Sequence, residues 1–145
     1  MTFYTIDTST IISRKLLALP DNFLFSSVVL LELLASANDD SERRLYENVY
    51  KAYSRDNSLI VPNGGDWLMA SKVLFWLAQG RKRGAKGKFP KLVPGAAQKM
   101  ALDALIATSA RRWKATIVTE NWDDFKAIQK YCDVKIVKAS EFFTD

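Results

Sequence analysis

The chain has 145 residues, about half of them apolar and a quarter charged, which is typical of a globular domain large enough to bury a core. It contains no histidine, which excludes Ser-His-Asp and Cys-His catalysis, histidine general bases and ordinary zinc sites. The formal charge of +5 weakly favours a polyanionic partner, although many soluble proteins are equally basic.

Cysteine content and hydropathy favour a cytoplasmic protein. Cys132 is the only cysteine, which excludes an internal disulfide framework and agrees with a reducing compartment. No apolar run approaches the roughly 20 residues that cross a bilayer, and the N-terminus lacks the basic and apolar regions of a signal peptide. We therefore expect no membrane partner.

Apolar periodicity predicts strands that alternate with helices along nearly the whole chain. Five strands are expected, at residues 3–6, 23–26, 58–62, 116–119 and 134–137. Helices are expected between and after them, at residues 8–19, 27–38, 39–56, 64–80, 96–115 and 122–131, with one more turn from Ser140. This order predicts an α/β fold whose parallel central sheet of about five strands is flanked by helices. No linker or internal repeat divides the chain, so residues 1–145 are expected to form a single domain.

Polar residues follow two of the predicted strands. Asp7 ends the strand at residues 3–6, and the segment TENWDDF follows the strand at residues 116–119. Functional residues of parallel sheets gather beyond the carboxyl ends of the strands, so these acids are expected at one edge of the sheet. The alternative is structural, because Asp7, Asn121 or Asp123 can each cap the helix that follows.

Two further acids interrupt apolar helices. Glu32 lies within VVLLELLASA, where it must extend to solvent, stay protonated or meet a cation. Asp103 lies within MALDALIATSA, and its structural alternative is an ion pair with Lys99 at i,i+4 spacing. Carboxylates held close together raise one another's pKa unless a cation neutralises them, and Mg²⁺ or Mn²⁺ prefers such oxygen ligands. A site of this kind can hydrolyse phosphodiesters without histidine.

Four segments in this order, YTIDTSTII, SSVVLLELL, ALDALIATSA and IVTENWDDF, resemble the PIN-domain nucleases, and in particular the VapC-type toxins of toxin–antitoxin pairs. The resemblance runs through most of the chain and implies a single PIN-like domain. It also implies a homodimer that acts as an endoribonuclease with Mg²⁺ or Mn²⁺ and is held inactive by an antitoxin protein.

The resemblance assigns the metal-coordinating acids to Asp7, Glu32 and Asp103, and Ser9 matches a hydroxyl that orients the first acid or a bound water. On this assignment, Asp7→Asn is expected to abolish cleavage. It is expected to leave stability without metal unchanged or improved, since charge repulsion is relieved.

The last motif matches the family pattern T-x-N-x-x-D-F through Thr119, Asn121 and Asp124. Family members place a fourth acid at the third or the sixth position of this pattern. Because Asn121 stands at the third position, Asp124 is the expected fourth metal and catalytic acid, with Asp123 as the alternative.

A basic segment, RKRGAKGKFPK, precedes the helix that carries Asp103. Its glycines would let the backbone approach nucleic acid, and Phe89 could stack on a base. The alternative is a solvated loop whose charges serve solubility. The residues expected to contact RNA phosphates are Arg81, Lys82, Arg83, Lys86, Lys88 and Lys91.

Three other functions are alternatives to a nuclease. A haloacid-dehalogenase-type phosphoryl transferase requires a second aspartate where this chain has Ser9. A nucleotide-binding domain requires a glycine pattern that is absent. The serious alternative is a catalytically inactive PIN-like module that binds RNA or protein.

Overall fold

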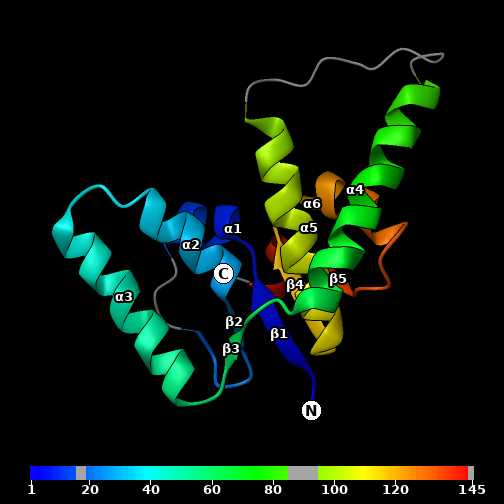
Figure 1. The fold of residues 1–145 in the computed structure, drawn as a ribbon. Coiled ribbons are helices and arrows are strands. Elements are labelled where there is room, and N and C mark those ends of the chain that lie inside the picture. Colours follow the sequence, from blue (N-terminus) through cyan, green and yellow to red (C-terminus); the bar gives the residue numbers. More distant parts are fainter. Residues whose placement is uncertain (16–18, 85–94, 144–145) are drawn as a thin grey trace.

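The computed structural model describes residues 1–15, 19–84 and 95–143, and strands and helices alternate in it as the sequence predicts (Figure 1). The strands are β1 (Phe3–Ile6), β2 (Phe25–Ser26), β3 (Leu59–Ile60), β4 (Ala115–Thr119) and β5 (Ile136–Lys138). The helices are α1 (Thr8–Arg14), α2 (Ser27–Ala35), α3 (Asp40–Arg55), α4 (Gly64–Gly84), α5 (Ala96–Arg112), α6 (Trp122–Gln129) and α7 (Ala139–Phe142).

The strands are all parallel, as expected, but they do not form one five-stranded sheet. The main sheet has three strands in the order β1-β4-β5, and β2 and β3 form a separate two-stranded ladder. A single bridge between Tyr4 and Phe23 joins the ladder to β1. The expected sheet of about five strands is therefore wrong in size. The reason is that β2 has only two residues before α2 begins at Ser27, which is too short to extend the pairing with β1.

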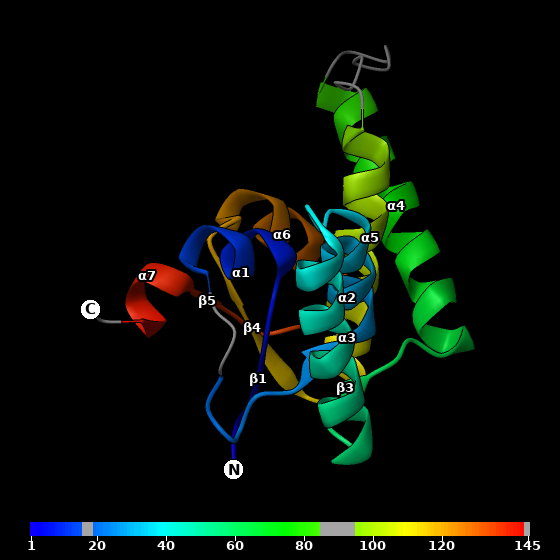
Figure 2. The same ribbon diagram turned by 90° about the vertical axis from the view of Figure 1, so that its left-hand side faces the viewer.

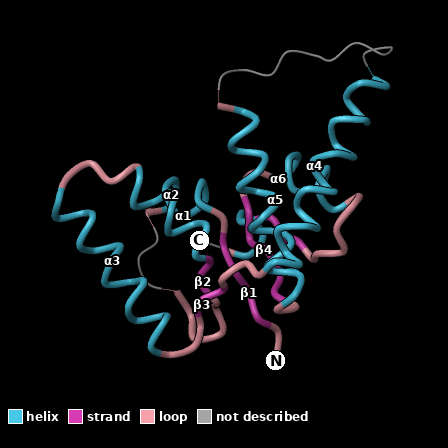
Figure 3. The backbone as a smooth tube through the Cα atoms, viewed as in Figure 1, coloured by secondary structure: helices cyan, strands magenta, loops and turns pink. Residues whose placement is uncertain are grey.

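Helices cover both sides of the main sheet. Figure 2 shows α7 on one side of the sheet and α4 and α5 on the other, and Figure 3 shows the helices around the strands. Ala104, Ala107 and Ala110 of α5 are completely buried, as are Ile117 and Val118 of β4. The small alanine side chains let α5 approach β4 closely, and this contact fixes the position of Asp103 relative to the sheet edge.

Helices α1 and α4 differ most in length from the expectation. Helix α1 ends at Arg14 because Lys15 adopts a left-handed conformation with φ 52°, and residues 16–18 lie outside the described residues. Helix α4 continues through Arg81 and Arg83, which the sequence placed in a loop. Arginine and lysine favour helices, and their positive charges are stabilised at a helix C-terminus.

The helices in the described part of the chain are also too short or too polar to span a membrane.

Candidate active site

Asp7 lies between β1 and α1 at the carboxyl edge of the sheet, and only 1% of its surface is exposed. It occupies the N-cap position of α1, but its side chain makes no capping hydrogen bond to the helix backbone. The simple capping role considered for this acid therefore does not account for it.

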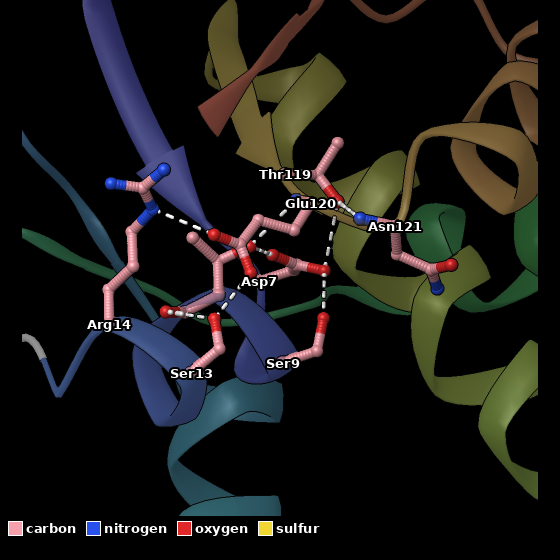
Figure 4. Close-up of polar contacts among 8 residues, drawn as sticks. Asp7, Ser9, Ser13, Arg14, Thr119, Glu120 and Asn121 are labelled. Atoms are coloured by element: carbon pink, nitrogen blue, oxygen red, sulfur yellow. Dashed lines mark hydrogen bonds and ion pairs between the residues drawn. The ribbon is translucent and has the colours of Figure 1, made fainter. Parts of the chain in front are cut away.

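Hydroxyl groups from two segments bind the Asp7 carboxylate (Figure 4). Ser9 Oγ donates to Asp7 Oδ2 at 2.9 Å, and Thr119 Oγ1 donates to the same oxygen at 3.0 Å. Thr10 Oγ1 donates to Asp7 Oδ1. Thr119 comes from the end of β4, which pairs with β1 in parallel register. Three donors compensate the loss of hydration that a buried carboxylate suffers, and they fix its orientation.

Asp103 lies on α5 with 3% of its surface exposed. Its Oδ2 atom forms an ion pair with Lys99 Nζ at 3.2 Å, the i,i+4 contact that the sequence offered as an alternative, and Asn121 Nδ2 lies 3.5 Å away. The pKa of Asp103 is raised to about 7, mainly by burial and also by the negative charges of Asp7 and Glu32, while Lys99 acts in the opposite direction. Asp7 at the start of α1 and Glu32 of α2 are therefore close enough to Asp103 of α5 for their charges to act on it.

Glu32 is half-buried on α2. Its Oε1 atom accepts a hydrogen bond from Thr8 Oγ1 at 2.8 Å, which ties α2 to the first residue of α1, directly after Asp7. The acid that interrupts the apolar helix is thus directed toward the carboxyl edge of the sheet.

The acidic turn after β4 carries two neighbouring acids, Asp123 and Asp124. Only Asp124 contacts the other site residues. Asn121 Nδ2 donates to Asp124 Oδ2 at 2.9 Å, and the charge of Asp124 also acts on Lys99. Asn121 makes no capping hydrogen bond with its side chain, although it holds the N-cap position of α6. Asp123 is exposed and forms no hydrogen bond or ion pair with any described residue.

Comparison with known proteins identifies the fold. No family model matches the sequence, and no curated protein matches it. Among solved structures, VapBC-1 from nontypeable Haemophilus influenzae is 20% identical, with a TM-score of 0.55 over 96% of this chain and 99% of that one. VapBC-5 from Mycobacterium tuberculosis, a member of the VapBC toxin–antitoxin family, is 19% identical, with a TM-score of 0.53 over 95% and 99% of the two chains. FitAB bound to a DNA fragment is 14% identical, with a TM-score of 0.57 over 94% and 95%.

The chain has a PIN-like α/β fold, shared with the matched VapBC and FitAB structures. The resemblance to PIN domains seen in the sequence is confirmed at the level of the fold, over nearly the whole chain.

The acids of this PIN fold offer oxygen ligands that suit a hard divalent cation. Oδ1 of Asp103 and Oε2 of Glu32 accept no hydrogen bond from the part of the chain that the structure describes. As the side chains stand, however, no three acidic or cysteine residues among those described form a group that could hold a metal ion. The residues fit such an ion in donor chemistry, and Lys99 supplies the positive charge in the present arrangement.

Sequence analysis missed two hydroxyls that organise the site. Thr8 and Thr10 flank Ser9, and together the three hydroxyls reach both Glu32 and Asp7. The run TST directly after a strand-ending acid was the signal, because the first turn of a helix brings residues i+2 and i+3 back beside its N-cap.

A second polar group lies next to the acidic site around Asp7. No sequence motif indicated it. Glu120 accepts hydrogen bonds from Ser13 Oγ and from Arg14 Nε, the latter at 2.7 Å (Figure 4). The pKa of Glu120 is lowered, mainly by the hydrogen bond from Ser13 and also by the hydrogen bond and charge of Arg14. The Glu120 backbone N–H also donates to Thr10 Oγ1 at 2.9 Å, so this group supports a threonine that binds Asp7.

Several elements carry basic side chains near the acidic site. Arg81 Nη1 lies 3.7 Å from Met100 Sδ at the start of α5, and Lys82 and Arg83 follow it in the last turn of α4. Figure 1 shows this end of α4 on the same side of the molecule as the carboxyl ends of β1 and β4. The expected RNA contacts Lys86, Lys88 and Lys91, with Phe89, lie outside the described residues. The sequence missed Lys126 and Lys138, which lie 5.5 and 5.1 Å from the centre of the Trp122 ring.

The stability of the metal-free protein is expected to fall with rising pH because of Asp103. Its pKa of about 7 in the folded state exceeds the ordinary value of 3.8. Between these values the folded state binds more protons than the unfolded state, so the free energy of unfolding decreases as the pH rises through this window. We expect wild type to lose roughly 1–3 kcal/mol between pH 5 and pH 8 relative to Asp103→Asn.

Urea unfolding in EDTA across this pH range tests the expectation. Asp123→Asn serves as the matched control, since it removes an exposed carboxylate nearby and should keep the wild-type slope. Identical slopes for wild type and Asp103→Asn would contradict the raised pKa of Asp103.

Proposed function

We propose that this chain is a metal-dependent endoribonuclease and the toxin of a toxin–antitoxin pair. The observation that carries the proposal is the position of Asp7, Glu32 and Asp103, three acids from separate elements at the carboxyl edge of a parallel sheet, where the charges of Asp7 and Glu32 both act on the buried Asp103. A buried group of like charges is costly unless a cation neutralises it, and it is retained most readily where it serves chemistry.

The residues proposed to hold Mg²⁺ or Mn²⁺ are Asp7, Glu32, Asp103 and Asp124. A bound ion would supply an activated water and would stabilise negative charge on the phosphoryl oxygens. Ser9 and Thr119 hold the Asp7 carboxylate in one orientation. Groups that support metal ligands in this way commonly change affinity or activity by 10–100-fold when they are removed.

Asn121 has the corresponding role on the other side of the site. Its side-chain amide donates to Asp124 and lies beside Asp103. One amide therefore fixes the positions of two acids, from α5 and α6, relative to each other. Its own backbone N–H is bound by Thr119 Oγ1 at 2.8 Å, which couples this amide to the Asp7 network.

The proposed partners follow from the fold and from charge. The similar VapBC structures include a toxin–antitoxin family member, which supports an antitoxin protein as partner and the toxin role for this chain. Single-stranded or structured RNA is the proposed substrate, held by basic residues such as Arg81 and Arg83 at the end of α4. A homodimer in the cytoplasm remains our proposal for its assembly and location.

Cleavage of a mixed pool of single-stranded and structured RNA tests the function. Wild type is compared with Asp103→Asn and with Asp123→Asn, in Mg²⁺, in Mn²⁺ and in EDTA. We expect cuts that require metal, that vanish in Asp103→Asn and that persist in Asp123→Asn. Equal activity of wild type and Asp103→Asn would identify a contaminating nuclease and contradict the proposal.

One observation favours the alternative of a catalytically inactive PIN-like binding module. The acids are not gathered into a metal-binding group in the described residues, and Lys99 already pairs with Asp103. A protein that binds RNA but gives no melting-temperature increase with Mg²⁺ or Mn²⁺ would support this alternative, because an ion that binds the folded state must stabilise it.

A further inference from the structure

Lys99 reaches into the acidic site from the first half of α5. Its ammonium forms a 3.2 Å ion pair with the buried carboxylate of Asp103, one helical turn further along. The two partners differ in exposure, since 48% of the Lys99 side chain is accessible whereas that of Asp103 is 5% accessible. The lysine can therefore leave the pair by rotating toward solvent, while Asp103 remains in place.

The ammonium of Lys99 serves more than one acid. Burial lowers the pKa of Lys99, but the charge and hydrogen bond of Asp103 and the charges of Asp124 and Asp7 outweigh it, so the pKa is raised. These acids come from α5, from α6 and from the end of β1. The ammonium of Lys99 thus contacts Asp103 and lies within the electrostatic influence of Asp7 and Asp124.

We propose that Lys99 is the internal counter-ion of the acidic site, which neutralises it in the metal-free protein and must leave Asp103 before a divalent cation binds there. This inference rests on the proposed function. It makes Lys99 a determinant of metal affinity, and it explains why the acids stay together without an ion.

The competition gives Lys99 a testable effect that does not depend on activity. With the ammonium removed, a divalent cation no longer displaces a charge that already pairs with Asp103. Loss of one competing positive charge near the protein surface is expected to change the affinity for the cation on the order of tenfold. Lys99→Met removes the charge and keeps an unbranched apolar side chain that is one atom shorter. Lys99→Gln also removes the charge but retains a donor for Asp103, so it serves as a second variant should Lys99→Met fold poorly.

Isothermal titration with Mn²⁺ at pH 8 measures this effect, with melting temperature in EDTA as a second readout. We expect Lys99→Met and Lys99→Gln to bind Mn²⁺ about tenfold more tightly than wild type and to melt at a lower temperature in EDTA. Lys135→Met is the matched control, because it removes an exposed positive charge just before β5, at the opposite end of the sheet. Its affinity should stay within about twofold of wild type.

The outcomes separate the counter-ion from the proposed function. Binding of Mn²⁺ to wild type that is unchanged or weaker in both Lys99 variants would overturn the counter-ion and leave the nuclease proposal standing. Binding that is equally absent from wild type, from the Lys99 variants and from Asp103→Asn would overturn both. A tighter affinity in the Lys135→Met control as well would assign the effect to net charge and reject the specific role of Lys99.

Discussion

Asp7→Asn is expected to reduce metal-dependent RNA cleavage by at least about a hundredfold, since even groups that only support metal ligands commonly contribute that much. The same change should destabilise the metal-free protein by about 1–3 kcal/mol. The reason is the hydroxyl network. Ser9, Thr10 and Thr119 all donate to the Asp7 carboxylate, and an amide offers one acceptor oxygen where the carboxylate offers two.

This network reverses the stability that the sequence led us to expect. Without knowledge of the donors, loss of the Asp7 charge was expected to leave stability unchanged or improved through relief of repulsion. In the structure, three threonine and serine hydroxyls compensate that charge, so we expect the loss of an acceptor to outweigh the relief. Cleavage assays and urea unfolding in EDTA measure the two effects separately.

Asp123→Asn is the matched control for both measurements, because Asp123 is an exposed acid close to the site that forms no hydrogen bond with any described residue. It should retain activity and stability. Wild-type cleavage by Asp7→Asn would contradict its place in the site. Unchanged stability of that variant would show that the hydroxyl network contributes little to folding.

Asp66→Ala is expected to have the largest effect on stability, about 3 kcal/mol, through two interactions lost at once. Asp66 Oδ2 accepts from the Asn63 backbone N–H at 3.0 Å, while Asn63 Oδ1 accepts from the Asp66 N–H, which is the reciprocal capping of a helix N-terminus. The same oxygen forms a 2.8 Å ion pair with Arg112 Nε, and Asp66 itself is buried. The change therefore loosens the start of α4 from the end of α5.

Urea unfolding of Asp66→Ala beside Glu47→Ala measures this cost. Glu47 also pairs with an arginine, Arg43, but both side chains are exposed on α3, and such pairs contribute at most about 1 kcal/mol. Equal losses for the two variants would contradict the importance of burial and capping at Asp66. Mn²⁺ affinity should be unchanged in Asp66→Ala, since Asp66 pairs with the last residue of α5 whereas Asp103 lies in the middle of that helix.

Some features of this site required no three-dimensional information. The parallel α/β fold follows from the alternation of strand and helix patterns, because periodicity is a local property of the chain. The ion pair between Lys99 and Asp103 also follows from local spacing, since residues four apart on a helix are neighbours. The arrival of Asp7 and the acidic turn at one edge followed from parallel topology alone.

Other features depended on packing between distant segments. The extent of the sheet was overestimated, because pairing of the two-residue β2 with β1 depends on where α2 begins its turn away from the sheet. The sequence already favoured Asp124 over Asp123, but the hydrogen bond from Asn121 to Asp124 depended on the orientation of α6, since adjacent helical residues point about 100° apart.

The fold class and the order of the elements follow from the sequence alone, which also predicts acids at the carboxyl edge of the sheet. Only the tertiary structure decided how those acids are held. The hydrogen bond from Thr119 to Asp7 spans 112 residues of sequence, and the raised pKa of Asp103 arises from burial and from the charges of Asp7 and Glu32 on other elements. Periodicity and local spacing describe one element at a time, whereas burial and contacts between side chains arise only when the elements pack together.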